Sequence, residues 1–309
     1  MRIAVVGSGS IGMLVTFYLS KSGHEVILLT NRKQQEKSVN ENSLNLLRND
    51  QKYNSSKVYA HTIHKIENIE PIDLLIITVK AYQVDEVLAH LENRQVHVKA
   101  ILFMQNGMSH VENISYLGFS EVAVAVIEHG AVRINDFTVH HTGIGQLKWS
   151  YIREGDQVIK DVFKTVSSVH FNISYSREWR QMLEDKLIVN ACINPLTALF
   201  LLKNGELLNN THYQQMMKRV FQEVSTVLEI KTEKQADYWG YVKDICLKTA
   251  DNHSSMVMDI KHRRKTEIDS IIGYLIRRAE KKQTQVAILP FLLEGIRAKE
   301  AQMGVLENG

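Results

Sequence analysis

Hydrophobic and polar positions follow different patterns in the first and second parts of the chain. Up to about residue 175, short apolar runs alternate with segments of helical spacing, whereas helical spacing alone continues from residue 178 to the end. Strands that alternate with helices are typical of a parallel sheet, and uninterrupted helical spacing is typical of an α-helical domain. The pattern predicts an α/β domain in residues 1–175 and an all-helical domain in residues 176–309.

Apolar runs predict the strands of the first domain. The main runs are residues 2–6, 25–29, 73–79, 99–104, 121–127 and 170–174. Such runs are typical of strands buried on both faces. We also expect short strands near residues 43–47 and 58–60, a hairpin of residues 137–141 and 146–149, and helices at 13–20, 156–168 and ending near 91. His140 and His141 are then expected on the surface of a sheet rather than as ligands.

Five helices are expected in the second domain, at residues 179–194, 211–231, 234–250, 254–281 and 287–301. Pro195 should break or bend the first helix, because proline lacks an N–H group and restricts the residue before it. Residues 204–207 have the composition of a helix stop, and Ser254 or Ser255 is a candidate N-cap.

A glycine-rich motif lies between the first strand and the first helix. Residues 7–12 read G-S-G-S-I-G, and a second strand follows the helix within the first thirty residues. In this context the glycines allow a tight turn and the close approach of a pyrophosphate to a helix N-terminus. The motif predicts a Rossmann-type dinucleotide site formed by Gly7, Ser8, Gly9, Ser10, Ile11 and Gly12, although a glycine-rich turn without a ligand is the alternative.

The residues after the second strand select the nucleotide. An NAD site usually has Asp or Glu there, whereas this chain has Thr30-Asn31-Arg32-Lys33. The guanidinium of Arg32 suits a 2′-phosphate, with Lys33 or Asn31 in support. This favours NADP(H) over NAD(H), unless these residues form only an exposed basic loop.

Polar or small residues follow three further strands. They are Lys80, Asn106 and Ala131, each a few residues beyond an apolar run. Ligands of open parallel sheets bind beyond the carboxyl ends of the strands, so these residues would surround the same crevice as the glycine motif. Each signal alone is weak, since Asn-Gly is usually a turn and a lysine after a strand is usually solvated.

A polar line interrupts the most apolar stretch of the chain, residues 186–204. Lys186, Asn190 and Asn194 recur at intervals of four, which places them on one face of a helix. A buried amide without a partner costs roughly 1–3 kcal/mol. The line therefore either pairs with other protein groups or faces a polar cavity.

Composition excludes several classes of protein. The 309 residues carry a net charge of +3 and two cysteines, which form neither a disulfide framework nor a zinc site. The longest apolar run, residues 191–202, falls short of the ~20 residues that a membrane helix needs. The basic run 261–265 is flanked by acids and suits a solvated face. We expect a cytoplasmic protein with no targeting segment and no metal, nucleic-acid or membrane partner.

Several motifs together resemble the ketopantoate reductase (2-dehydropantoate 2-reductase) family. They are the glycine motif, V-K-A at 79–81, Q-N-G at 105–107, H-G-A at 129–131, the run Lys186, Asn190, N-P-L-T-A at 194–198, N-G-E-L at 204–207, and S-S-M at 254–256 with K-T-E-I-D at 265–269. The resemblance covers nearly the whole chain. It implies reduction of 2-dehydropantoate to (R)-pantoate with NADPH, on the path to pantothenate and coenzyme A, in a cleft between a Rossmann domain and a helical domain.

The resemblance also implies a role for each matched residue. Lys186 becomes the proton donor, and Asn106 touches both cofactor and substrate. The other substrate contacts are Asn190, Asn194, Asn204 and Ser255, and the other cofactor contacts are Gly7, Ser8, Gly9, Ser10, Ile11, Gly12, Arg32, Lys80, Ala131 and Glu267.

Some alternatives stay open beside the resemblance. Ile272 stands where the family often has asparagine, and residues 145–147 match only loosely, which leaves room for another branched 2-oxo acid as substrate. A non-catalytic NADP(H)-binding sensor is a second possibility. The alternative for Glu267 is an exposed ion pair with Arg263. The chain should act as a monomer or homodimer on a small-molecule 2-oxo acid.

Overall fold

The secondary structure of the chain falls into two units. The computed structural model describes residues 1–55, 58–69, 71–114 and 118–304. Unit 1 comprises Met1–Gln105 and Asn113–Met182, and unit 2 comprises Asn106–Glu112 and Leu183–Gly309. Because a single helix crosses from one unit to the other at Met182, the domain boundary after residue 175 stays a prediction.

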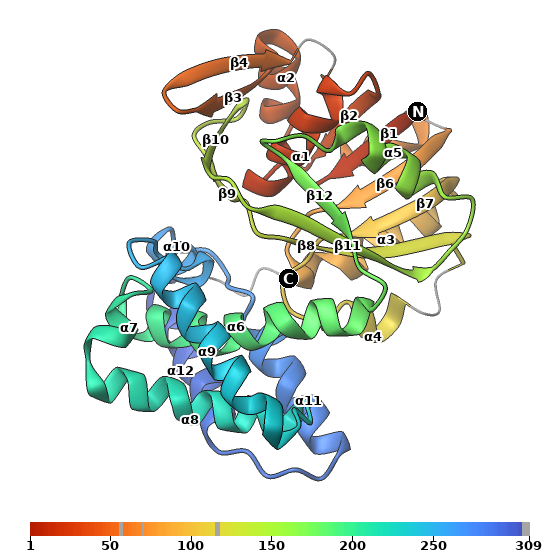
Figure 1. Ribbon diagram of the computed structural model, residues 1–309. Helices are drawn as coiled ribbons and strands as arrows, with labels where there is room; N and C mark the ends of the chain where they lie inside the picture. Colours follow the sequence, from red (N-terminus) through yellow and green to blue (C-terminus); the bar gives the residue numbers. More distant parts are fainter. Residues whose placement is uncertain (56–57, 70, 115–117, 305–309) are drawn as a thin grey trace. The chain divides into compact units, whose positions relative to one another are not determined.

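An eight-stranded sheet forms the centre of unit 1 (Figure 1). Its order is β12 (Asn172–Tyr175), β11 (Gln146–Arg153), β8 (Glu121–Ile127), β7 (Val98–Phe103), β6 (Ile72–Ile77), β1 (Arg2–Val6), β2 (Glu25–Thr30) and β5 (Val58–Thr62). Neighbouring strands are parallel except for β8 and β11, which are antiparallel. The strands predicted from the apolar runs are therefore confirmed, and so is the Rossmann-type α/β class.

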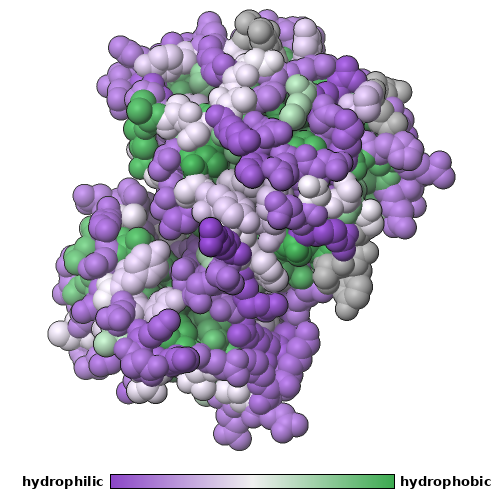
Figure 2. Space-filling view, turned by 45° about the vertical axis from the view of Figure 1, so that its right-hand side comes forward, coloured by the Kyte–Doolittle hydropathy of each residue, from purple (hydrophilic) through white to green (hydrophobic). Residues whose placement is uncertain are grey.

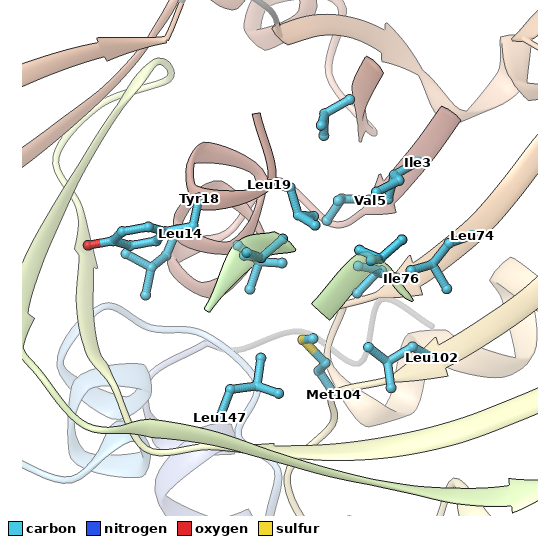
Figure 3. Close-up of a cluster of buried hydrophobic side chains, with 14 of the residues drawn as sticks. Ile3, Val5, Leu14, Tyr18, Leu19, Leu74, Ile76, Leu102, Met104 and Leu147 are labelled. Carbon is cyan, nitrogen blue, oxygen red and sulfur yellow. The ribbon is translucent and has the colours of Figure 1, made fainter. Parts of the chain in front are cut away.

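Side chains of the sheet are buried on both faces, as their uninterrupted apolar runs require. On one face, Ile3, Val5 and Ile76 pack with Leu14 and Leu19 of helix α1 (Ser10–Lys21), and Figure 3 shows these residues together. Helix α5 (Val158–Val166) adds five buried residues to the same cluster. The hydrophobic effect of this burial fixes α1, and with it the glycine motif at its start.

A second sheet of four strands contradicts the predicted hairpin. Its order is β4 (Gln51–Ser55), β3 (Leu44–Arg48), β10 (Thr138–Gly143) and β9 (Gly130–Arg133). β10 pairs with β9 and β3, whereas β11 pairs with β8 and β12 in the large sheet, so β10 and β11 do not form the expected hairpin. The glycines between them mark the point where the chain passes from one sheet to the other. Gly145 is required there, because a Cβ would lie 2.4 Å from the Glu128 carbonyl oxygen.

The polar segment 33–70 is more structured than its sequence pattern suggests. Helix α2 (Lys33–Asn42) buries only Gln35 and Val39, a face too narrow to produce a visible apolar period. The short strands expected there are confirmed as β3 and β5, and the polar strand β4 adds a partner to β3. A 3₁₀ segment, η1 (Ile63–Ile69), follows β5.

His141 is buried, which corrects the expectation of a surface position. Its side chain lies between Tyr18 of α1 and His129, with Nδ1 2.9 Å from the Tyr18 hydroxyl and Nε2 3.0 Å from His129 Nδ1. Phe171 stacks on both Tyr18 and His129. Because β10 belongs to the small sheet, the side of the strand expected to face solvent packs against α1 instead.

Unit 2 contains the helices expected of an all-helical domain (Figure 1). They are α6 (Trp179–Phe200, beginning in unit 1), α7 (Glu206–Asn209), α8 (Thr211–Val227), α9 (Thr232–Lys248), α10 (Ser255–Lys261), the π-helix η3 (Asp269–Gly273), α11 (Tyr274–Lys281) and α12 (Ile288–Gln302). Short elements elsewhere are η2 (Ala81–Gln83), α3 (Val84–Asn93) and α4 (Val111–Ile114). The fold class predicted for the second part of the chain is confirmed.

Two helix boundaries in unit 2 differ from those expected. α6 continues through Pro195 to Phe200, since proline has a helical φ and the Thr197 hydroxyl bonds the carbonyl groups of Ile193 and Asn194. The helix ends at Leu201, which has φ 57°. The expected helix 254–281 is interrupted after Lys261, so that α10, η3 and α11 replace it. Ser254 is the N-cap of α10, as predicted, and accepts from the Val257 N–H.

The surface is largely polar. Figure 2 shows hydrophilic residues over most of the visible face, with apolar residues in small separate groups. Within residues 1–55, 58–69, 71–114 and 118–304, no helix has the length and apolarity needed to span a membrane. Both cysteines, Cys192 and Cys246, are free and buried in the core.

Candidate functional site

The glycine motif has the conformation that its spacing predicts. Gly7 has φ +108°, and a Cβ there would lie 2.8 Å from both the Thr78 hydroxyl and the Val79 nitrogen. A Cβ on Gly12 would lie 1.7 Å from the Gly7 carbonyl oxygen. The Thr78 side chain also donates to the carbonyl of Gly7 at 3.0 Å. These two glycines therefore let the loop pack tightly on the end of β6.

Gly9 differs from the other two glycines, because a Cβ at this position would meet nothing within 4 Å. Gly9 is the N-cap of α1 and has no side chain to cap the first backbone N–H groups. Ser10 and Ile11 begin the helix, and Ser10 Oγ accepts from the Arg133 N–H at 3.1 Å. Open space at an uncapped helix N-terminus suits an anionic phosphate. The residues present fit the pyrophosphate of a dinucleotide.

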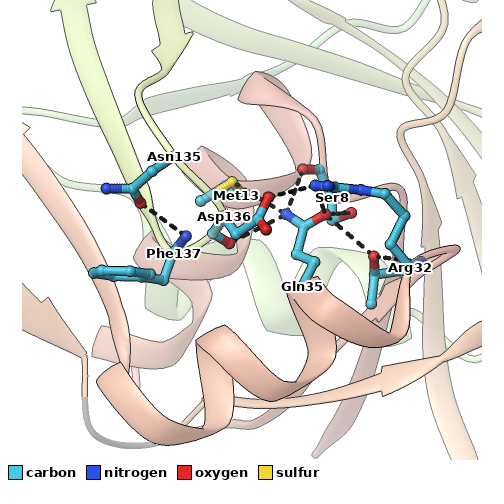
Figure 4. A network of polar contacts seen from close by, with 8 residues as sticks. Ser8, Met13, Arg32, Gln35, Asn135, Asp136 and Phe137 are labelled. Carbon is cyan, nitrogen blue, oxygen red and sulfur yellow. Dashed lines mark hydrogen bonds and ion pairs between the residues drawn. The ribbon is translucent and has the colours of Figure 1, made fainter.

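Arg32 lies beside the glycine motif in a polar network (Figure 4). It is the N-cap of α2, and Nη2 donates to Gln35 Oε1 at 3.1 Å and pairs with Asp136. Gln35, which is 1% exposed, also accepts from the Ser8 hydroxyl at 2.7 Å and donates to the Ser8 carbonyl at 3.0 Å. The network thus brings the predicted 2′-phosphate partner to the glycine loop.

Two of the three residues predicted at strand ends, Lys80 and Ala131, belong to unit 1 with the glycine motif, whereas Asn106 belongs to unit 2. Lys80 comes two residues after Thr78 and is the half-buried N-cap of η2. Ala131 belongs to β9, whose Arg133 bonds Ser10. The preceding His129 accepts from the Gly145 N–H at 3.1 Å, and its burial, with His141 nearby, lowers its pKa to about 4. His129 is therefore neutral at neutral pH and holds this turn by hydrogen bonding.

The polar line in unit 2 lies on one continuous helix. Lys186 and Asn190 are half-buried, and Asn194 is 7% exposed. Since α6 runs as one helix from Trp179 to Phe200, all three residues share a face. Proline at 195 does not displace Asn194 from the line, which was the main doubt raised by the sequence.

Two other predicted substrate contacts, Ser255 and Asn204, lie elsewhere in unit 2. Ser255 is the exposed first residue of α10, and the adjoining Ser254 hydroxyl lies 2.9 Å from the Thr197 hydroxyl of α6. Asn204 is held by Thr249, whose hydroxyl accepts from Nδ2 at 2.9 Å. Its Oδ1 is buried and has no hydrogen-bond partner among the described residues.

Two further predicted site residues of unit 2, Asn106 and Glu267, are bonded to each other. Asn106 Nδ2 donates to Glu267 Oε2 at 2.9 Å, although 161 residues separate them in the chain. Gly107 has φ +77°, and a Cβ there would lie 2.1 Å from the Ser270 carbonyl oxygen, which accepts from Met108. Glu267 is 6% exposed. It is therefore not the exposed ion-pair partner of Arg263 that the sequence left as an alternative.

The structure adds three polar residues that the sequence did not identify. Thr78 bonds the glycine loop, while Gln35 and Asp136 surround Arg32. Thr78 is the second-last residue of the strand predicted at 73–79, two residues before Lys80, so its position at the carboxyl edge was a usable signal. Gln35 and Asp136 had no such signal, because α2 and the β9–β10 turn were not predicted.

Among the described residues, no group of three or more His, Cys, Asp or Glu could hold a metal ion. A parallel sheet, a glycine loop that packs without side chains and a neighbouring guanidinium define a dinucleotide-binding enzyme of the oxidoreductase class. Within that class, the helical second unit and its lysine-asparagine line are the features that distinguish one family from another.

Comparisons with known proteins identify the family. The family model described as "Ketopantoate reductase PanE/ApbA" matches residues 3–154, and that described as "Ketopantoate reductase PanE/ApbA C terminal" matches residues 178–300. The chain belongs to the ketopantoate reductase family.

Relatives match over almost their full length. A 2-dehydropantoate 2-reductase of Bacillus subtilis is 37% identical over 302 residues, which are 97% of this chain and 98% of the relative. One from Listeria innocua is 33% identical and covers 99% of both chains. A crystal structure of a probable 2-dehydropantoate 2-reductase from Bacillus subtilis superposes with a TM-score of 0.85 at 37% identity, covering 97% of this chain and 100% of that one.

Proposed function

We propose that this protein reduces 2-dehydropantoate to (R)-pantoate with NADPH, the reaction that leads towards pantothenate and coenzyme A. The observation that carries the proposal is the lysine-asparagine line on the unbroken helix α6, in a chain that belongs to the ketopantoate reductase family and has an intact glycine loop. The fold provides the nucleotide site, and the line provides the polar groups that a small, oxygen-rich substrate requires.

Cofactor contacts are proposed in unit 1, and the family resemblance suggests two more, Asn106 and Glu267, which belong to unit 2. Gly7, Ser8, Gly9, Ser10, Ile11 and Gly12 would hold the pyrophosphate at the start of α1, Arg32 the 2′-phosphate, and Lys80, Ala131, Asn106 and Glu267 the remainder. The open space at Gly9 and the exposed half of the Arg32 side chain support the first two assignments. When bound, the nicotinamide supplies a hydride to the ketone carbon of the substrate.

Lys186 is proposed as the proton donor. Reduction of a ketone places negative charge on its oxygen, and a protonated amine beside that oxygen stabilises the charge and then supplies the proton. Lysine is the one cationic member of the line on α6, and its half-buried position keeps the amine within reach of a ligand. General acid catalysis of this kind typically contributes a factor of about 10²–10⁴.

Neutral polar groups are proposed to orient the substrate. Asn190, Asn194, Asn204 and Ser255 can donate to a carboxylate or accept from a hydroxyl without adding charge that would compete with the lysine. The buried Oδ1 of Asn204 is an acceptor that a substrate hydroxyl could satisfy, and α10 is bonded to α6 beside Asn194 through Ser254.

Asn106 and Glu267 are proposed to act as a unit. The carboxylate accepts from the Asn106 amide and so fixes the side-chain rotamer of Asn106, whose amide oxygen stays directed away from the carboxylate. Such a fixed amide suits a residue that contacts both cofactor and substrate. We further propose a cytoplasmic enzyme that works as a monomer or homodimer, with the domains divided after residue 175.

A panel of 2-oxo acids tests the proposed substrate. Purified protein is mixed with NADPH and each acid in turn, and consumption of NADPH is followed by its absorbance. The highest kcat/KM is expected with 2-dehydropantoate. A higher value with another branched 2-oxo acid would assign the protein to that substrate, and cofactor binding without turnover of any acid would indicate a sensor.

A further inference from the structure

The acid next to Arg32 is the feature that the proposed function leaves unexplained. Asp136 comes from the turn between β9 and β10, 104 residues from Arg32, and its carboxylate pairs with Nη2 of the guanidinium (Figure 4). Half of the Arg32 side chain is exposed, whereas the Asp136 side chain is 23% exposed. The Asp136 carboxylate is thus ion-paired with the same guanidinium that is predicted to bind the 2′-phosphate.

Asp136 is held in place by its own turn and by Gln35. The Ile134 N–H bonds the Thr138 carbonyl at 2.9 Å, and the Phe137 N–H bonds Asn135 Oδ1 at 3.0 Å. The Asp136 carbonyl accepts from Gln35 Nε2 at 3.2 Å. The carboxylate is therefore presented by a fixed backbone and is not a loosely placed surface group.

Gln35 couples this turn to the phosphate-binding loop. Its Oε1 accepts from the hydroxyl groups of Ser8 and Thr30 and from Arg32, while its Nε2 donates to the carbonyl groups of Ser8 and Asp136. These contacts define the orientation of the amide. They also place the carboxylate, the guanidinium and the loop within one hydrogen-bonded network.

We propose that Asp136 sets cofactor preference by competing with the 2′-phosphate of NADP(H) for the Arg32 guanidinium. This inference rests on the proposed role of Arg32 and deepens it. A phosphate monoester carries a charge of about −1.5 to −2 at neutral pH, against −1 for a carboxylate, so the phosphate takes the guanidinium when it is present. Both contacts of Arg32 to the network use Nη2, and a guanidinium has five donors, so Arg32 can turn to the phosphate while Gln35 keeps its loop contacts.

The competition lowers affinity for NADP(H) but not for NAD(H), which has no 2′-phosphate. Removing the charge with Asp136→Asn keeps the shape of the side chain and frees the guanidinium. NADPH and adenosine 2′,5′-bisphosphate should then bind roughly fivefold more tightly, the gain expected when one half-exposed ion pair is released. The dissociation constant of NADH should stay unchanged.

Calorimetric titration of four proteins tests the proposal: wild type, Asp136→Asn, Arg32→Ala and the double variant. Arg32→Ala should weaken NADPH binding, and Asp136→Asn should bring no gain in that background, because the competition acts through Arg32. Asp161→Asn serves as the matched control. It removes the same charge from an exposed pair with Lys164 on α5 and should change neither cofactor's affinity.

Several results would overturn the proposal. Competition at the guanidinium would be excluded by any of three results: unchanged or weaker NADPH binding by Asp136→Asn, an equal gain in affinity for NADH, or a gain in NADPH affinity that persists without Arg32. The assigned role of Arg32 would still stand as long as Arg32→Ala weakens NADPH binding. If Arg32→Ala bound NADPH with the affinity of wild type, both the competition by Asp136 and the assigned role of Arg32 would be overturned. Absence of ketone reduction would refute the proposed activity alone, since these titrations measure binding without turnover.

Discussion

Disrupting the Asn106–Glu267 hydrogen bond should impair catalysis by an amount that the structure allows to be estimated. The bond is 2.9 Å long and joins an amide to a carboxylate that is 6% exposed. Hydrogen bonds to charged groups contribute about 1.5–3 kcal/mol, which corresponds to roughly 10- to 150-fold in kcat/KM. Glu267→Ala should fall in that range, and Glu267→Gln should lose less because an amide oxygen can still accept.

A double-mutant cycle measures this coupling directly. Initial rates of 2-dehydropantoate reduction give kcat/KM for wild type, Asn106→Ala, Glu267→Ala and the double variant. If the carboxylate acts by positioning the amide, the double variant should lose little more than the more damaging single change, with a coupling free energy of about 1.5–3 kcal/mol.

Additive losses in this cycle would refute the idea that the two residues act as a unit. Glu294→Gln provides the control, because Glu294 is a 70% exposed member of an ion pair with Arg297 on α12. Exposed pairs contribute about 0–1 kcal/mol, so this change should leave kcat/KM close to that of wild type.

Three further predictions concern the loop, pH and unit 1. Gly12→Ala places a Cβ 1.7 Å from the Gly7 carbonyl oxygen, so the loop must shift and NADPH affinity should fall at least about tenfold in a fluorescence titration; unchanged affinity would contradict the loop geometry. Burial lowers the pKa of His110 to about 3, so the unfolded chain binds more protons than the folded chain between that value and about pH 6.5, and His110 alone should lower the free energy of unfolding by about 2–3 kcal/mol between about pH 7.5 and 4.5; the fall measured by denaturant unfolding should be smaller by about this amount in His110→Gln, and an equal fall would contradict it. Glu121 is fully buried and accepts from two N–H groups at the start of α5 at 2.9 Å each; Glu121→Gln should cost roughly 1–3 kcal/mol in denaturant unfolding, and a neutral effect would contradict the assigned bonds.

Strands of the large sheet were predictable because burial on both faces leaves continuous apolar runs in the sequence. The ends of the helices in unit 2 were harder to predict. Leu201, Glu229, Arg263 and Gln283 all have φ between 53° and 58°, and each follows the last turn of a helix. Glycine usually fills this position, so no glycine marks the ends of these helices in the sequence. For this reason a single helix was expected at residues 254–281, where the structure has α10, η3 and α11.

Contacts between distant residues explain the other differences. The β10–β11 hairpin was expected from proximity in sequence, but the strands join different sheets. His141 became a core residue because its strand packs against α1. Within the candidate site, the glycine spacing and the i, i+4 line were readable because they are local patterns. Asp136 was not, since only the tertiary fold brings it to Arg32.

The measurement that tests the account most directly is turnover by Lys186→Ala. The variant should lose reduction of 2-dehydropantoate by a factor of about 10²–10⁴ while its dissociation constant for NADPH stays that of wild type. Lys218→Ala, on the exposed side of α8, is the matched control and should retain full activity. Near-normal turnover by Lys186→Ala would contradict the assignment of this lysine as the proton donor.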